Sequence, residues 1–310
     1  MTTPAPTRLT ARTPEDLLAM VPVVLGFHPE DSVVLLTFAA DRPFHARVDL
    51  PDLADHDEPV VEMLLAPALH HHVRRAAVIV YAGAARADDG RRVGQRLVAA
   101  LGADGVDVVD ALLADGTRWR ALRERADPGV PYDLTTHRFT AQAVLDGRPL
   151  LRSRAELAAA LEPDPAGAAG VDVLLDRVDR RLDAPGVAAA VAEHLPAGRF
   201  PDPVLAAVLA AIRAPAVRDG AWTPVHRAVA RDHVRLWTDA VRRAPARVRG
   251  SAAAVLAFAA WTAGDGALAW CAVDRCVEVD PTNSLAELVG DLLQGAVPPD
   301  AFTEAGVTRS

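Results

Sequence analysis

The feature that most constrains the fold of this chain is a pair of apolar helical runs near its C-terminal end. Residues 250–295 are rich in Ala, Val and Leu, and Gly264-Asp265 and then Asp280-Pro281 interrupt them. Glycine after a helix and a following Asp-Pro step are typical helix ends. The sequence therefore predicts a helical hairpin followed by the first helix of another. Ala269 and Cys276 are the small residues that would let the paired helices approach closely.

This hairpin resembles a tetratricopeptide repeat, whose helix pairs of about 34 residues stack into binding grooves. The resemblance covers a single repeat, and Cys276 stands where the family usually has Ala. It implies a binding role rather than catalysis. We expect Ala269 to be buried where two helices cross and Cys276 to lie beside the neighbouring helix.

Trp270 is the residue of this hairpin most suited to binding. It follows Ala269, and neighbouring residues on a helix point about 100° apart, so we expect Trp270 to face a flank or solvent. Large aromatic side chains are common anchors of interfaces. The alternative is that Trp270 is buried against Trp261 or Leu288.

The first half of the chain alternates strand and helix patterns, which predicts an α/β domain over residues 1–150. The expected strands, all before about residue 125, are 32–38, 44–50, 78–81, 106–112 and 117–120. The apolar run 32–38 should be buried on both faces. The short link after it predicts an antiparallel hairpin with 44–50, and therefore a mixed sheet.

The second half, residues 151–310, predicts an all-α, tetratricopeptide-like helical domain. The expected helices are 171–194, 203–213, 224–243, 251–263, 265–279 and 285–294, with residues 164–170 as a loop. Capping boxes at Ser153 and Ser284 mark two helix starts. Thr223-Pro224 would start the helix that carries His226 and His233.

Composition excludes several functional classes. The chain of 310 residues has a net charge of −8, which argues against general nucleic-acid binding. All 33 basic residues are Arg, so lysine Schiff-base and P-loop chemistry are excluded. Arginine pairs such as Arg91-Arg92 and Arg242-Arg243 are expected on solvated helix faces.

The sequence also predicts a cytoplasmic protein that does not associate with membranes. The start of the chain lacks a basic stretch followed by an apolar core, which argues against a secretion signal. The apolar stretch 252–263 is too short to span a bilayer. Cys271 and Cys276 are expected to be free thiols packed as small apolar residues.

No catalytic residue, cofactor or metal site is predicted. Cys271 and Cys276 lie five residues apart on one expected helix, and His226 and His233 seven apart, whereas a helical zinc pair uses a spacing of four. His28 and Asp31 share a turn with Glu30 before the first strand. They could form a metal or acid–base cluster at the sheet edge, or simply close the preceding helix.

Arg218 and Asp219 precede Trp222 at an expected helix start. They could form a structural ion pair or cap, or a ligand-facing pair where the two domains meet. We keep Arg218, Asp219, Trp222, His28 and Asp31 beside Trp270 as candidate binding residues.

Several segments occur in the order found in an actinobacterial family known as domain of unknown function 4192. They include Leu25-Gly26-Phe27-His28-Pro29, Asp31-Ser32-Val33-Val34, Pro131-Tyr132-Asp133, Val217-Arg218-Asp219, Leu236-Trp237-Thr238 and Gly264-Asp265-Gly266-Ala267-Leu268-Ala269. The chain resembles this family over nearly its whole length. It lacks the family's cysteines before Pro131, so a metal site there is not expected. The resemblance implies no known activity.

Two functions remain open. The first is a non-enzymatic interaction or scaffold protein that binds a partner protein, or a second copy of itself, through its helical domain. The second is a hydrolase or nucleotide-binding enzyme with a site at the sheet ends near His28, Asp31, Tyr81 and Asp110. A pocket lined by those polar residues would favour the enzyme.

Overall fold

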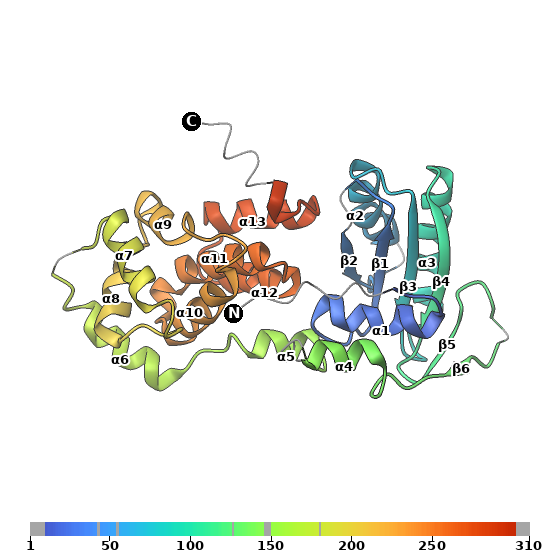
Figure 1. Cartoon of the computed structure of the whole chain (residues 1–310), viewed down its shortest axis with the longest axis horizontal. Helices are drawn as coiled ribbons and strands as arrows, with labels where there is room; N and C mark the ends of the chain where they lie inside the picture. The colour runs from blue at the N-terminus through green and yellow to red at the C-terminus, as the bar shows by residue number, and fades with distance from the viewer. Residues whose placement is uncertain are drawn as a thin grey trace. The chain divides into compact units, whose positions relative to one another are not determined.

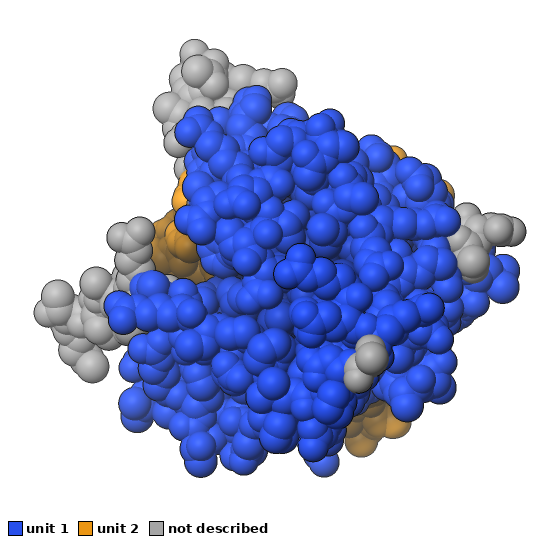
Figure 2. Space-filling model, turned by 90° about the vertical axis from the view of Figure 1, so that its right-hand side faces the viewer, with its two compact units in different colours: residues 1–154 blue, residues 155–310 orange. Residues whose placement is uncertain are grey.

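A computed structural model gives the fold of the chain. It describes residues 10–41, 44–53, 56–125, 127–145, 150–179 and 181–301. Most of the N-terminal stretch that was considered as a secretion signal lies outside these residues. The chain divides into two compact units, which we call the N-terminal unit (Met1–Arg154) and the helical unit (Ala155–Ser310) (Figure 2).

The N-terminal unit is built on a mixed six-stranded sheet with the order β2-β1-β3-β4-β5-β6. The strands are β1 (Ser32–Phe38), β2 (His45–Asp49), β3 (Arg75–Tyr81), β4 (Asp107–Ala114), β5 (Arg118–Ala121) and β6 (Val130–Pro131). As predicted, β1 and β2 form an antiparallel hairpin; β3 pairs antiparallel with β1 and parallel with β4. The mixed sheet is confirmed, whereas the two-residue β6 was not predicted.

Helices cover both faces of this sheet (Figure 1). The helices α1 (Pro14–Leu25) and α4 (Arg138–Leu145) lie on one face, and α2 (Asp57–His70) and α3 (Ala87–Ala103) lie on the other. The side chains of β1 point alternately to the two faces of the sheet. Val33 packs toward α2 and α3, and Val34 packs toward α1. The prediction that this strand is buried on both faces is confirmed.

Two glycines on α3 differ sharply in the space around them. A Cβ added at Gly94 would lie 2.7 Å from Val80 Cγ2 and 2.9 Å from Leu122 Cδ2, whereas one added at Gly102 would meet nothing within 4 Å. Gly94 therefore permits the close approach of α3 to β3.

We expect Gly94→Ala and Gly102→Ala to change stability in opposite directions. Alanine favours a helix by about 1 kcal/mol over glycine at either position. At Gly94 the overpacking against Val80 should outweigh this gain and cost about 1–3 kcal/mol. Urea unfolding of both variants measures the difference, and equal stabilisation of the two would show that α3 does not need the glycine.

The helical unit surrounds one central helix. Its helices are α5 (Arg154–Ala159), α6 (Pro165–Leu175), α7 (Ala184–His194), α8 (Asp202–Ala211), α9 (Pro215–Trp222), α10 (Ala230–Arg243), α11 (Ala246–Ala263), α12 (Gly266–Val277) and α13 (Ser284–Gln294). From Val248 to Thr262 every residue of α11 is buried, and the helix packs against α8, α9, α10, α12 and α13. Throughout the described parts of the chain, no helix is long and apolar enough to cross a membrane.

The predicted hairpin is present as α11 and α12, joined at the left-handed Gly264. Ala269 and Cys276 are both fully buried, as expected. The other predicted free thiol, Cys271, is buried as well. Because five helices enclose α11, the pair does not stand open on one side. The likeness to a tetratricopeptide repeat is therefore not confirmed.

Several predicted boundaries in the helical unit are wrong. Residues 164–170 are not a loop, because the side chain of Asp164 caps α6 by accepting a hydrogen bond from Gly167 N at 3.1 Å. The expected helix 171–194 is two helices, since Asp183 caps a new start at α7. Asn283, rather than Ser284, caps α13: its side chain accepts from Leu285 N and Ala286 N.

The expected helix 224–243 is also wrong at its start. The helix α10 begins at Ala230, and Thr223 closes the preceding α9 instead of opening a new helix. His226 consequently lies outside the helix that carries His233. Pro215 instead is the first residue of α9, a helix that was not predicted.

Candidate functional site

The turn that carries His28 and Asp31 is held by its backbone. His28 N donates to Leu151 O at 3.0 Å, and Leu50 N donates to Asp31 O at 2.8 Å. Both side chains are exposed. Across the described residues there is no group of three or more His, Cys, Asp or Glu side chains placed to hold a metal ion. The turn therefore anchors β1 to the end of β2 through main-chain bonds.

The structure does not gather the residues of the enzyme hypothesis. Tyr81 belongs to the core under α1, where burial raises its pKa well above 10. Its hydroxyl and that of Ser32, its partner across the strands, have no hydrogen-bond partner within the described chain. Asp110 lies further along the sheet, where it pairs with Ala77, four positions before Tyr81.

Arg218 is a buried structural link in the helical unit. It lies inside α9 rather than at a helix start, and is only 5% exposed. Its Nη1 donates to Asn283 Oδ1 at 2.8 Å and its Nη2 to Ser284 Oγ at 2.9 Å. Burial lowers the pKa of its guanidinium. Because Asn283 caps α13, Arg218 connects α9 to the first turn of α13.

Asp219 and Trp222 make a second, separate contact on α9. Trp222 Nε1 donates to Asp219 Oδ1 at 2.8 Å, and the Trp222 ring centroid lies 4.8 Å from that of Phe258. Arg218 thus bonds to the α13 cap while Asp219 bonds to Trp222.

Trp270 is neither exposed nor fully buried. It is half-buried on α12 and packs partly against the core of the helical unit. This position lies between the two alternatives, a side chain at a flank or in solvent and a buried one, because part of the ring lies over the core beside it. Val277, seven residues further along α12, is 46% exposed. Asp274, which lies between Trp270 and Val277, and Glu278, which follows Val277, are exposed as well.

These four residues form a continuous strip. The spacing i, i+4, i+7 and i+8 places side chains on one side of a helix. We call Trp270, Asp274, Val277 and Glu278 the α12 face. It combines a large aromatic ring, an exposed aliphatic side chain and two carboxyl groups.

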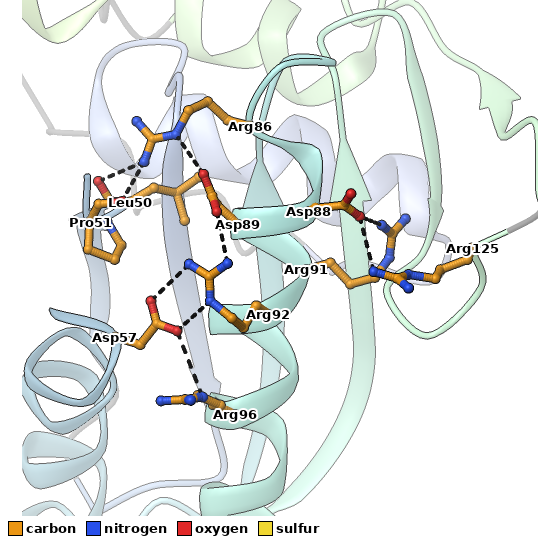
Figure 3. A network of polar contacts seen from close by, with 10 residues as sticks. All are labelled: Leu50, Pro51, Asp57, Arg86, Asp88, Asp89, Arg91, Arg92, Arg96 and Arg125. Atoms are coloured by element: carbon orange, nitrogen blue, oxygen red, sulfur yellow. Dashed lines mark hydrogen bonds and ion pairs between the residues drawn. The ribbon is translucent and has the colours of Figure 1, made fainter. Parts of the chain in front are cut away.

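A network of arginines and aspartates that was not predicted from the sequence joins α2 to α3 (Figure 3). Asp57, the first residue of α2, is fully buried, and Arg92 binds both of its carboxylate oxygens, at 2.7 and 3.3 Å. Arg96 lies 3.8 Å from the same carboxylate. The side-chain bonds to Asp57 and then to Asp89 raise the pKa of Arg92.

The network extends along α3 and fastens it to its surroundings. Arg86 Nη2 donates to Pro51 O at 2.6 Å, beyond the end of β2, and Asp88 pairs with both Arg91 and Arg125 (Figure 3). Arg91 is buried, so the expectation that both members of the Arg91-Arg92 pair lie on a solvated face is wrong. The spacing of Asp89, Arg92 and Arg96 on one helix was the available sequence signal. Asp57, the buried partner of Arg92, gave no such signal in the sequence.

The family described as "Domain of unknown function (DUF4192)" matches residues 14–300, which confirms the resemblance seen in the sequence. No curated protein and no solved structure matches the chain significantly.

Proposed function

Because this chain belongs to the family described as a domain of unknown function, DUF4192, we propose a function from its own geometry. We propose that it is a non-enzymatic interaction protein that binds a partner protein through the α12 face. The observation that carries this proposal is a half-buried Trp270 in line with an exposed Val277.

The chemistry of the α12 face indicates the kind of surface it would fit. A tryptophan that already rests on its own core loses little side-chain freedom on binding, which favours its use as an anchor. Asp274 and Glu278 would lie at the rim of the contact. Glu278 already pairs with Arg275 at 3.0 Å, so the contact with a partner would be mainly apolar. The complementary surface is therefore an apolar pocket, in the manner of a helix bound in a groove.

The test places a photoreactive amino acid at Val277 in the full chain, inside the cells that produce it. Val173, which is 53% exposed on α6, takes the same amino acid as the control position. We expect a discrete crosslinked product from position 277 and none from 173. A product of twice the mass of the chain would identify the partner as a second copy. Equal products from both positions would contradict a specific surface.

We expect Trp270→Ala to weaken formation of this product at least about tenfold, since anchor tryptophans contribute more than about 1–2 kcal/mol to binding. Trp222→Ala is the matched control, because it removes another half-buried tryptophan of the same unit away from the α12 face. Crosslinking is compared at temperatures where both variants remain folded by circular dichroism. Crosslinking that survives in Trp270→Ala would remove the α12 face from the proposal.

A further inference from the structure

The first half of β4 has a free outer edge. The strand β5 pairs only with Leu112–Ala114 of β4, and Leu122 N then adds one bond to Ala111 O at 2.8 Å. Beyond this bond the chain turns away, since Glu124 N donates to Ala121 O at 3.0 Å. Before Ala111, β4 has no partner on this side among the described residues. We call residues 107–110 the open edge, because unpaired main-chain groups of this kind can bind another strand.

A pocket of about 340 Å³ lies beside the open edge, between β4 and α3. Apolar side chains of Val98 and Ala99 on α3, of Val108 on β4, and of Leu122 line it. This volume is sufficient for an aliphatic side chain. Free main-chain groups next to a pocket for every second side chain are the arrangement by which a sheet binds an extended peptide.

A bulge places two carboxylates on the opposite face of the open edge. The register between β4 and β3 shifts at Val109. Before the shift Asp107 pairs with Arg75, and after it Asp110 pairs with Ala77. Arg75 and Ala77 are two residues apart and therefore point to one face, which is the face under α1, because Ala77 belongs to that core. Asp107 and Asp110 consequently share this face although they are three residues apart.

The Asp110 carboxylate lies at the open edge without a cation. The Ala111 main chain is directed to the β5 side, where its carbonyl accepts from Leu122 N, and Asp110 Oδ1 accepts from the Ala111 N–H at 3.0 Å. Among the described side chains none forms an ion pair with Asp110, and partial burial raises its pKa. Asp107, in contrast, lies 3.5 Å from Arg75. A strand added here would therefore meet Asp110 as the uncompensated charge.

We propose that the open edge binds an extended peptide segment of a partner protein, in which an aliphatic residue is flanked by Arg or Lys. Side chains alternate along a strand, so the aliphatic one would enter the pocket while its neighbours lie on the face of Asp110. Like charges opposite each other destabilise paired strands, and opposite charges stabilise them. The carboxylates and the bulge thus protect the edge from a second copy of itself and select a basic strand. This surface is separate from the α12 face and belongs to the N-terminal unit.

The test is fluorescence polarisation of the full chain with a fluorescein-labelled peptide amide of sequence Thr-Arg-Val-Arg-Thr. Arginine on both sides of valine makes the probe suitable for either strand direction. Glutamate in place of both arginines, or serine in place of valine, should weaken binding at least about tenfold, since each removes a charged or an apolar contact. Equal binding of the glutamate peptide would overturn the proposal, as would absence of binding by the arginine peptide.

N-methylated peptides test whether the probe adds as a strand. Alternate N–H groups of a strand point to the same neighbour. One methyl group, placed on the valine nitrogen or on the nitrogen that follows, should therefore weaken binding at least about tenfold more than the other. Unchanged binding of both methylated peptides would show that no main-chain pairing occurs and would overturn the proposal.

Two variants of the chain assign the contacts. Asp110→Asn removes the charge, and Ala99→Leu fills the pocket from an exposed position of α3, so each should weaken binding of the arginine peptide about tenfold. The matched controls are Asp49→Asn, an exposed carboxylate on β2, and Ala103→Leu, one turn beyond Ala99 and outside the pocket. Circular dichroism verifies that all four variants are folded. Unchanged affinity in Asp110→Asn or Ala99→Leu would overturn the proposal.

Discussion

Replacing Arg243 with Met is expected to destabilise the helical unit by about 3 kcal/mol or more. Arg243 is 2% exposed at the end of α10. Its Nη1 donates to Asp202 Oδ1 at 2.6 Å, its Nε to Asp239 Oδ2 at 3.0 Å and its Nη2 to Phe200 O at 2.8 Å. Methionine fills much of the same volume but leaves Asp202 and the buried carbonyl oxygen of Phe200 without this donor, whereas Asp239 keeps Arg199 at 2.7 Å.

The neighbouring Arg242 is the matched control, because it is exposed on the same helix. Arg242→Met should change the free energy of unfolding by less than about 0.5 kcal/mol. Urea unfolding followed by tryptophan fluorescence is a suitable measurement, since Trp222, Trp237, Trp261 and Trp270 all lie in the helical unit. Equal effects of the two substitutions would contradict the buried position of Arg243.

Acidification is expected to destabilise the helical unit through His233. This side chain is 1% exposed on α10, and burial lowers its pKa to about 4, whereas an unfolded chain has a value near 6.5. The unfolded state therefore binds more protons between these values. The contribution of His233 to stability is complete above about pH 6.5, and it falls by about 3 kcal/mol as the pH approaches 4.

His233→Leu should remove this pH dependence, because leucine has a similar volume and does not titrate. His226→Gln is the control, since His226 is exposed outside α10. The free energy of unfolding, measured in urea at about pH 7 and about pH 4.5, gives the loss for each variant. A loss in His233→Leu as large as in the native chain would rule out His233 as the cause. Burial also lowers the pKa of His45 to about 4, so the N-terminal unit has an acid-sensitive histidine of its own.

The sheet was predictable because its strands carry a strong local signal. The run from Val33 to Leu36 is apolar at every position, which is typical of a strand covered on both faces, and helices do lie on both faces. The hairpin of α11 and α12 was predictable for a similar reason, since Gly264 marks the end of a long apolar run. Helix starts were less predictable. Asp-Pro and Thr-Pro steps look alike in sequence, yet Asp164-Pro165 begins a helix and Thr223-Pro224 does not.

The role of a side chain was predictable only where its contacts lie within one helix or strand. Arg242 and Arg243 are identical residues in adjacent positions, and a turn of about 100° exposes one and buries the other. The partners of Arg243, Asp202 and Phe200, precede it by 41 and 43 residues, so no local pattern contains them.

The central position of α11 has a consequence for how the helical unit is made. The helices α8, α9 and α10 precede α11 in the chain, and each packs against it. While the chain is being synthesised, their apolar sides have no central helix to cover them until residues 246–263 have left the ribosome. Exposed apolar surface of this kind promotes aggregation. The helical unit should therefore complete its core late in translation, when α11 arrives, and not helix by helix.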